Sequence, residues 1–173
     1  MKALVTGASS GIGYSIARCL SNIGYDLIIV ARRKDCLLNL KKECKTNVEI
    51  ITMDLSIISN VYKLYEKTKR HDIDILVNNA GVGLYGEFYD IDLQKEMDML
   101  RLNIGATNIL TKLYLKDMIK KNKGRILNVS SIFGFMPGPL MSSYYASKAY
   151  ITSFSRAINM ELKMKNINVG IST

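Results

Sequence analysis

The chain has 173 residues, of which 48% are hydrophobic and 23% charged, and only two are proline. This composition excludes a disordered or fibrous protein and predicts one globular domain with a sizeable core. The formal net charge of +9 comes from basic residues that are dispersed and not interleaved with aromatics, so we expect no nucleic-acid partner.

The numbers and spacing of cysteine and histidine residues indicate which metal and thiol chemistry, and which cellular compartment, to expect. Cys19, Cys36 and Cys44 form no Cys-x-x-Cys pair, and His71 is the only histidine. We therefore expect reduced thiols, a cytoplasmic location and no metal site. Strand-like residues begin almost at the N-terminus and no apolar run is long enough to cross a bilayer, so neither a signal peptide nor a membrane partner is expected.

Short apolar runs alternate with amphipathic stretches along the chain. Runs rich in Ile, Val and Leu with little polar alternation are typical of strands buried on both faces of a parallel sheet. Strands are predicted at Ala3–Thr6, Asp26–Ala31, Val48–Met53, Ile73–Asn78, Arg125–Ser130 and Ile167–Ile171. Helices are predicted at Ile12–Ile23, Lys34–Lys45, Ile58–Arg70, Leu93–Lys121 and Tyr144–Lys165. The alternation predicts an α/β protein: a Rossmann-type, doubly wound parallel sheet in three layers with about six strands.

A glycine-rich segment follows the first predicted strand and opens the first helix. Glycine lets the backbone approach a ligand closely, and the unpaired N–H groups of a helix start suit a pyrophosphate. The spacing is Gly-x-x-x-Gly-x-Gly, and its place between strand and helix is the context of a dinucleotide site. Cofactor contacts are predicted from Gly7, Ser9, Ser10, Gly11, Ile12 and Gly13. The alternative is a plain strand–turn–helix corner.

The second predicted strand ends at Arg32 and Arg33, with no acidic residue beside them. In doubly wound folds an acid at this place binds the ribose 2′-hydroxyl of NAD, whereas a basic residue accommodates the 2′-phosphate of NADP. Arginine matches phosphate geometry with a two-pronged fork. The sequence therefore favours NADP over NAD as the cofactor. The alternative is that both arginines are surface charges flanking a helix.

Two further strand ends carry polar or small residues. Asp54, followed by Leu55, is placed to accept a hydrogen bond from the adenine amino group, or to cap the next helix. The fourth strand ends in Asn78-Asn79-Ala80-Gly81. Small residues there leave space for a cofactor, and asparagine side chains can bind the backbone of adjacent strands. Structural and functional roles both remain open for Asn79, Ala80 and Gly81.

Tyr144 and Lys148 lie four residues apart on the last predicted helix. Positions i and i+4 share a helix face, so the ammonium lies beside the phenol. A free phenol has a pKa of about 10, and a nearby cation favours the phenolate. Such a pair can pass a proton to or from an oxygen. A solvated helix face is the alternative, and the upstream motifs favour the catalytic interpretation.

Taken in order, these residues resemble the short-chain dehydrogenase/reductase family. The matching signals are Thr6-Gly7-x-x-x-Gly11-Ile12-Gly13, Asp54-Leu55, Asn78-Asn79-Ala80-Gly81, Asn103, Ser131 and Tyr144-x-x-x-Lys148, and they span nearly the whole chain. The catalytic serine of that family lies thirteen positions before the tyrosine, which selects Ser131 over Ser130. The lysine spacing likewise selects Tyr144 over Tyr145. The surroundings of the arginines and the tyrosine look like a branch that uses NADPH.

The resemblance implies hydride transfer between NADPH and a small-molecule carbonyl or alcohol substrate. Tyr144 would protonate the carbonyl oxygen, and Ser131 would orient it. Lys148 would assist the tyrosine and hold the nicotinamide ribose. Asn103 would hold a water that links Lys148 to solvent. The alternative for Asn103 is that it marks a helix kink, since asparagine is a mediocre helix former.

Members of this family continue past the sixth strand into a substrate-covering segment and a seventh strand. Residues 1–173 are therefore expected to form a single dinucleotide-binding domain that lacks the lid and last strand. The alternative function is a cofactor-binding module without turnover. The loops Gly83–Tyr89 and Ile132–Ser143 are apolar, which favours an apolar substrate. A homodimer or homotetramer is expected through the helices that carry Asn103 and Tyr144.

Overall fold

The fold is described from a computed structural model that covers residues 1–173. Six parallel strands form one sheet in the order β3-β2-β1-β4-β5-β6. The strands are β1 (Lys2–Thr6), β2 (Asp26–Ala31), β3 (Val48–Thr52), β4 (Ile75–Asn78), β5 (Gly124–Asn128) and β6 (Val169–Ser172). The chain leaves β3 at one edge and returns beside β1, so the sheet is doubly wound as predicted.

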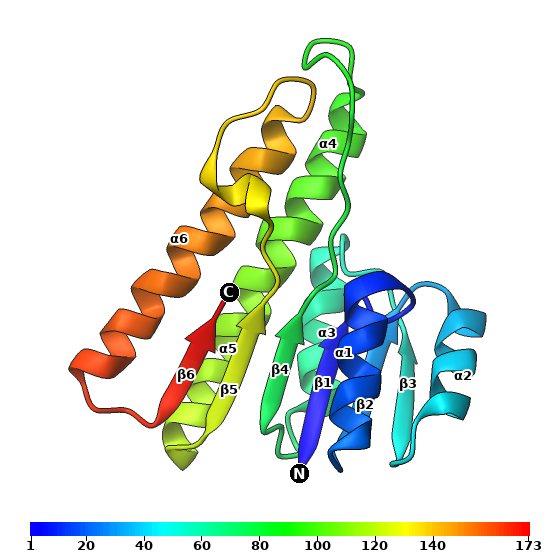
Figure 1. The fold of residues 1–173 in the computed structure, drawn as a ribbon, viewed down its shortest axis with the longest axis vertical. Coiled ribbons are helices and arrows are strands. Elements are labelled where there is room, and N and C mark those ends of the chain that lie inside the picture. Colours follow the sequence, from blue (N-terminus) through cyan, green and yellow to red (C-terminus); the bar gives the residue numbers. More distant parts are fainter.

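Helices cover the two faces of the sheet (Figure 1). They are α1 (Gly11–Asn22), α2 (Lys34–Glu43), α3 (Ile58–Thr68), α4 (Leu93–Leu100), α5 (Thr107–Lys121) and α6 (Ser142–Met164). Residues of α1 and α2 pack in one hydrophobic core, and residues of α3, α5 and α6 pack in the other. The three predicted layers are therefore confirmed.

The strand sequences explain why there are two cores. Successive side chains of a strand point to opposite faces of the sheet. In β1, Leu4 packs in the core beneath α3 and α5, whereas Val5 packs in the core beneath α1 and α2. In β2, Ile28 and Ile29 alternate in the same way. All four side chains are fully buried, which is why these strands show no polar alternation.

The long helix predicted from Leu93 to Lys121 has an irregular centre. α4 runs into a π-helical segment, η1 (Arg101–Ala106), which leads into α5. A π-turn inserts extra backbone into a helix, and such turns occur frequently at functional sites. The uniform α-helix of the prediction is therefore wrong at this point, and the irregularity includes Asn103.

Other differences concern element ends. β5 stops two residues before the predicted end because its neighbour β4 also stops, and Asn78 and Asn128 form the last pair of their register. A short 3-10 helix, η2 (Ile132–Phe135), follows where only a loop was expected. α6 begins at Ser142 rather than at Tyr144. No helix of the structure is both long enough and apolar enough to cross a membrane.

Candidate cofactor and active site

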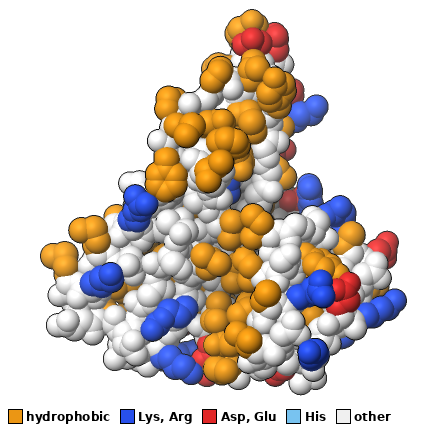
Figure 2. All heavy atoms as spheres, viewed as in Figure 1, with side chains coloured by type: hydrophobic (Ala, Val, Ile, Leu, Met, Phe, Trp, Pro, Cys, Tyr) orange, Lys and Arg blue, Asp and Glu red, His pale blue; other side chains and the backbone are white.

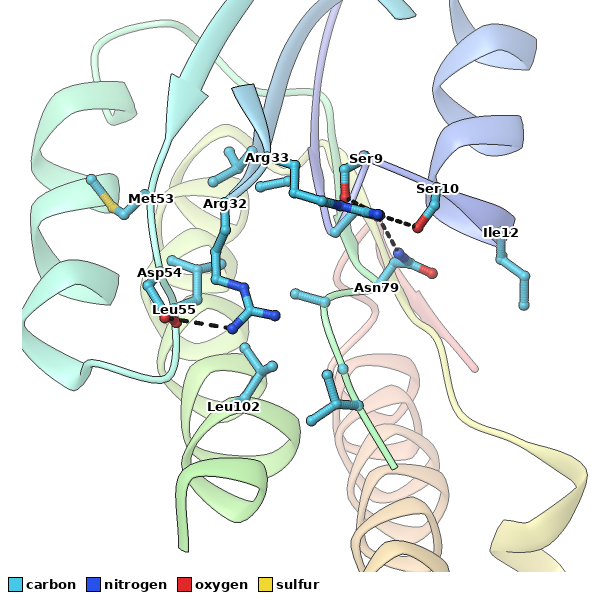
Figure 3. Close-up of a pocket in the computed structure, with 16 residues that line it drawn as sticks. Ser9, Ser10, Ile12, Arg32, Arg33, Met53, Asp54, Leu55, Asn79 and Leu102 are labelled. Carbon is cyan, nitrogen blue, oxygen red and sulfur yellow. Dashed lines mark hydrogen bonds and ion pairs between the residues drawn. The ribbon is translucent and has the colours of Figure 1, made fainter. Parts of the chain in front are cut away.

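A cavity of about 340 Å³ lies at the carboxyl ends of the first four strands (Figure 3). The strand order reverses beside β1, and ligands of open α/β sheets bind at such a reversal. The volume lies at the lower end of the range for small-molecule sites. The walls are Gly7, Ser9, Ser10, Ile12, Val30, Ala31, Arg32, Arg33, Met53, Asp54, Leu55, Asn79, Ala80, Gly81, Val82 and Leu102.

The glycine loop is held against β4 by Asn79. Its side-chain Nδ2 donates hydrogen bonds to Thr6 O and Gly7 O, both at 3.1 Å. Gly7 has a left-handed φ of +67°, and a Cβ there would lie only 2.7 Å from Asn79 Nδ2. A Cβ on Gly13 would collide with the same nitrogen and lie 2.6 Å from Gly7 O. Asn79 therefore has a structural role in addition to lining the cavity.

Thr6, the last residue of β1, also connects the glycine loop to the end of β4. Its buried Oγ1 accepts hydrogen bonds from Asn79 N at 3.0 Å and Ala80 N at 3.1 Å. It also donates to Val77 O at 3.2 Å. One hydroxyl thus joins the end of β1 to the end of β4. The sequence motif contains Thr6, but sequence reasoning gave it no role in the site.

Arg33 and Arg32 reach into the cavity from the end of β2 and diverge (Figure 3). Arg33 Nη2 donates to Ser9 Oγ at 3.1 Å and Ser10 Oγ at 2.8 Å. Arg32 Nη1 lies 3.8 Å from Asp54 Oδ2. The end of β2 is therefore a basic rim that adjoins two serine hydroxyls. This chemistry suits an anionic group, since guanidinium and hydroxyl donors both bind phosphate oxygens.

Asp54 faces the basic rim from the end of β3. Its Oδ1 accepts from Ser56 N at 2.9 Å and Ser56 Oγ at 2.8 Å. Partial burial opposes ionisation, but the bonds from Ser56 and the Arg32 charge outweigh it and hold the pKa of Asp54 below its usual value of 3.8. The N-cap residue of α3 is Ile57, so the proposal that Asp54 caps the next helix is wrong.

Lys148 is buried beside the far end of the cavity. The residue lies in the second turn of α6, and its Nζ donates a hydrogen bond to Val129 O at 3.0 Å. Burial lowers the pKa of Lys148 below its ordinary 10.5, because desolvation disfavours the ammonium form. Nζ lies 5.8 Å from the centre of the Tyr144 ring. The two groups are therefore on one face of the helix, at cation–π distance.

Tyr144 belongs to the first turn of α6, and its ring lies beside η2 and the segment that follows β4. Its ring meets Phe133 edge to face, with centroids 6.4 Å apart, whereas Tyr145 stacks on Phe133 at 4.6 Å. A Cβ on Gly83 would lie 3.6 Å from the Tyr144 ring, and one on Gly81 would lie 3.6 Å from the amine of Lys148. The segment from 81 to 83 therefore connects the cavity to the tyrosine and the lysine.

The two adjacent serines have different surroundings. Ser130 Oγ donates to Lys148 O at 2.9 Å and lies 2.7 Å from Thr152 Oγ1, so it ties β5 to α6. Ser131 Oγ only accepts from Phe133 N, at 3.2 Å, and caps the short helix η2. A hydroxyl that accepts can still donate its own proton. Ser131 is therefore the serine whose hydroxyl proton is not bound within the chain.

Asn103 lies in the π-helical segment and is buried. Its Oδ1 accepts from Val82 N at 3.0 Å, and its Nδ2 donates to Val82 O at 2.9 Å and to Ser147 Oγ at 3.2 Å. The side chain thus holds both α6 and the segment after β4. The alternative predicted for Asn103 is a helix kink, whereas the structure has a π-helical segment at this residue. One lone pair of Oδ1 remains free to accept from a water.

Most predicted cofactor residues line the cavity, but not all do. Gly11 and Gly13 do not, because Gly13 packs under the loop against Asn79. Tyr144 and Lys148 lie beyond Gly81 and Gly83 rather than in the cavity wall. Sequence reasoning missed Val30, Ala31, Met53, Val82 and Leu102. These apolar residues carry no signal that separates a cavity wall from an ordinary core position.

The residues present fit a nicotinamide dinucleotide. The glycine loop approaches closely at a helix start, a basic rim follows β2, and an ionised carboxylate follows β3. Together with the sheet order, they define the class of Rossmann-type dinucleotide-binding proteins.

Comparison with known proteins narrows this class to a family. The sequence model of the short chain dehydrogenase family matches residues 1–172. The chain belongs to this short-chain dehydrogenase/reductase family, whose members use NAD(P) and are generally oxidoreductases that act on CH–OH groups. The family inferred from the motifs is thereby confirmed.

Individual relatives are about one-third identical to the chain over the aligned residues. Hydroxysteroid dehydrogenase-like protein 1 of Gallus gallus is 36% identical, over 96% of this chain and 53% of that protein. Human very-long-chain 3-oxoacyl-CoA reductase is 34% identical, over 96% and 56%. A metagenomic short-chain oxidoreductase solved in complex with NADP superposes with a TM-score of 0.92 at 30% identity, over 99% and 79%. The chain thus spans about half the length of the first two relatives.

Proposed function

We propose that the protein is an NADPH-dependent oxidoreductase that transfers hydride between the cofactor and a carbonyl or alcohol. The observation that carries the proposal is the position of Tyr144 and Lys148. Both lie against the segment from Gly81 to Gly83, and Gly81 forms one end of the cavity. A proton donor is therefore held next to the place where the reactive end of a bound dinucleotide would lie.

The cavity residues would hold the cofactor in a definite direction. The start of α1 and the loop of Gly7, Ser9, Ser10, Gly11, Ile12 and Gly13 would bind the pyrophosphate. Arg33, with Ser9 and Ser10, and Arg32 would bind the 2′-phosphate, which favours NADP over NAD. Asp54 and Leu55 would meet the adenine. The central part of the dinucleotide would lie along Asn79, Ala80 and Gly81. Its nicotinamide ribose would contact Tyr144 and Lys148.

The chain supplies the acid, its support and the orientation of the substrate. When bound, the cofactor provides or accepts the hydride. Ser131 Oγ donates to the substrate oxygen and fixes its direction. The Tyr144 hydroxyl gives its proton to that oxygen as the carbonyl is reduced, and takes it back in the reverse direction. The ammonium of Lys148, within 6 Å of the ring, stabilises the negative charge that develops on the phenol oxygen.

The proton of Tyr144 is replaced through Lys148 and Asn103. Burial lowers the pKa of Lys148, so its amine gives up a proton more readily than a solvated lysine does. Asn103 Oδ1 lies near Gly81, next to the lysine amine, and keeps one free lone pair for a water. That water would pass protons between the amine and solvent.

The substrate is proposed to be apolar. Large apolar side chains of the loop that precedes α6 are exposed, among them Ile132 at 73% and Phe135 at 63%. One relative is a reductase of very-long-chain 3-oxoacyl-CoA by name, which is consistent with an apolar substrate. Assembly as a homodimer or homotetramer and a cytoplasmic location stay predictions.

Replacement of Tyr144 by Phe tests the chemistry. Tyr144→Phe should lower kcat for a generic ketone by about 10²-fold or more, since general acid catalysis contributes that much. NADPH affinity should stay nearly unchanged, because the ring remains. Tyr145→Phe is the matched control, since that ring stacks on Phe133 and its hydroxyl makes no hydrogen bond within the chain. Undiminished turnover of Tyr144→Phe would show that Tyr144 is not the general acid.

Cofactor titration tests the basic rim. NADPH should bind at least about tenfold more tightly than NADH, which corresponds to about 1.4 kcal/mol. Arg33→Ala should remove most of that difference without weakening NADH. The exposed Arg18, which pairs with Glu43 away from the cavity, provides the control Arg18→Ala. Equal affinities of the unmodified protein for the two nucleotides would refute the NADP assignment.

A second function, a cofactor-binding module without turnover, is favoured by the length comparison. The chain spans 53% and 56% of two of its relatives, so residues beyond this span contribute to those proteins. The test compares ketone reduction by residues 1–173 with reduction by a form extended at the C-terminus. Equal and robust reduction by the short form would eliminate the binding module.

A further inference from the structure

The start of α6 is held by polar contacts from the neighbouring helix. Ser143 Oγ donates a hydrogen bond to Glu96 Oε1, and Asn103 Nδ2 donates to Ser147 Oγ at 3.2 Å. Ser143 and Ser147 are one turn apart, as are Tyr144 and Lys148 on the adjacent face. The two serine contacts therefore help to hold the helix segment that carries both proposed catalytic groups. Asn103 already belongs to the proposed site, whereas Glu96 has no role in it.

Glu96 is an unusual residue at its position. Its side chain is only 7% exposed, and no lysine or arginine pairs with it. The carboxylate of Asp98, two residues further on α4, is half-exposed and pairs with Arg101 at 2.6 Å. A buried carboxylate is costly unless its oxygens are bound. The side chain of Asp92 caps α4, so Glu96 is not needed as its cap, although its negative charge in the first turn also suits that helix start.

The first turn of α6 lacks what Glu96 provides. Its N-cap residue, Met141, makes no side-chain capping bond, and no acidic residue lies in the first turn. A helix start has unpaired N–H groups and a partial positive charge, which favour an acceptor with negative charge. The carboxylate of Glu96, which comes from α4, supplies an acceptor and a negative charge at this helix start. It does so by accepting a hydrogen bond from Ser143, the residue directly before Tyr144.

Tyr144 depends on this turn for its position. Within the chain no hydrogen bond holds its hydroxyl, and the ring is located by the α6 backbone, by Phe133 and by the Gly83 backbone. Nearby, Gly86 N donates to Leu140 O at 2.9 Å, so the loops that precede α4 and α6 are joined as well. The contact between α4 and the first turn of α6 thus fixes the phenol relative to the rest of the site.

We propose that Glu96 is a positioning residue, which places the Tyr144 hydroxyl by accepting the hydrogen bond of Ser143. The inference rests on the proposed function only for the catalytic role of Tyr144. The contact itself is tested on the 173-residue chain without any turnover. Hydrogen–deuterium exchange of the amides from 143 to 148 reports how firmly the first turns of α6 are held.

Four single variants make up the exchange experiment. Glu96→Ala and Ser143→Ala should each raise the exchange rate in this segment about tenfold, as expected for a lost hydrogen bond to a charged group. Glu96→Gln keeps an acceptor oxygen and should stay within about threefold of the unmodified chain. Asp98→Ala is the matched control on α4 and should leave the segment unchanged. Should Glu96→Ala fail to fold, Ser143→Ala removes the same bond with the loss of one oxygen.

Kinetics on an active form of the protein extend the test to Tyr144. Glu96→Ala and Ser143→Ala should lower kcat about tenfold with unchanged NADPH affinity, because a misplaced acid slows the chemical step. The double variant should be no slower than the slower single one, since both remove one contact. Glu96→Gln should restore most of kcat.

Unchanged amide exchange from 143 to 148 in both alanine variants would overturn the proposal. A Glu96→Gln variant whose exchange rate and kcat change as much as those of Glu96→Ala would also overturn it. Absence of turnover in the unmodified protein would count against the proposed function alone, because the exchange data still decide the role of Glu96.

Discussion

The two ends of the site differ in whether hydrogen bonds fix the groups that would meet a ligand. At the cavity end, the buried Thr6 and the partly buried Asn79 bind backbone groups, and they join the glycine loop to β4 through five hydrogen bonds of 3.0 to 3.2 Å. At the other end, hydrogen bonds hold Lys148 and Asn103, but the Tyr144 hydroxyl has no partner within the chain and its ring packs against Phe133. Large apolar side chains surround that end and remain exposed on the upper part of the molecule (Figure 2).

The contrast separates two properties of the protein. Hydrogen bonds between buried groups and backbone have narrow geometry, so the cavity end keeps one shape and suits a cofactor of fixed structure. Packing of rings and exposed apolar side chains tolerates changes in shape, so the other end suits a variable substrate. Stability and cofactor affinity should therefore respond to changes at the first end, and substrate choice to changes at the second.

The largest effect is expected at Gly13. A Cβ there would lie 2.6 Å from Gly7 O and collide with Asn79, so Gly13→Ala should cost about 3 kcal/mol in the free energy of unfolding. Gly11→Ala is the control, because no atom lies within 4 Å of its Cβ and only the left-handed φ of +59° is strained, at about 1 kcal/mol. Urea unfolding measures both. Equal costs would show that the loop does not depend on the close approach to Asn79.

A smaller loss is expected from Thr6→Val. The change keeps the shape of the side chain but leaves the amides of Asn79 and Ala80 without their acceptor, which should cost about 2 kcal/mol. Thr52 at the exposed end of β3 makes no side-chain hydrogen bond, so Thr52→Val should change stability little. Thermal unfolding of the two variants at one pH makes the comparison. A neutral Thr6 variant would contradict the role given to this junction.

The two ends should also differ in their response to pH. The pKa of Lys148 is lowered by burial, so above its folded-state pKa and up to about 10.5 the unfolded chain binds more protons than the folded one. The free energy of unfolding should therefore rise with pH in this window, and Lys148→Met should lack that rise. At the cavity end, the pKa of Asp54 is lowered, so its contribution is lost as pH falls below 3.8.

Unfolding of the unmodified chain and of Lys148→Met and Asp54→Asn across this pH range measures both effects. Parallel curves for the unmodified chain and Lys148→Met between neutral pH and about pH 10 would contradict the burial of a cation at the catalytic end.

The smallest effect on stability is expected at Phe135. Its side chain is 63% exposed, with its ring 5.2 Å from Arg156, so Phe135→Ser should change the free energy of unfolding by less than about 0.5 kcal/mol. The KM for an apolar ketone should nevertheless rise several-fold, because apolar contact area is lost. Tyr62→Ser, on the distant surface of α3, should change neither. A large loss of stability at Phe135 would remove the distinction between the two ends.

The sequence by itself determined the sheet and much of the cavity. Unbroken apolar runs, such as those around Leu4 and around Ile28, predict strands buried on both faces. This prediction does not require knowing which strands lie beside them. Parallel strands place their carboxyl ends at one edge, so Ser9, Arg33 and Asp54 were expected in one place. The signals are local: glycines, charges and apolar runs at fixed positions along the chain.

Only the tertiary structure decided which polar groups meet. The Glu96–Ser143 bond joins residues 47 positions apart, and Asn79 reaches the loop around Gly7 across 72 positions. The π-turn at Asn103 likewise arises within a stretch whose pattern predicts an ordinary helix. Periodicity tells which face of an element is buried, but the partner of a buried polar side chain depends on how two elements pack. That packing is fixed by the whole core, so no single segment of sequence contains it.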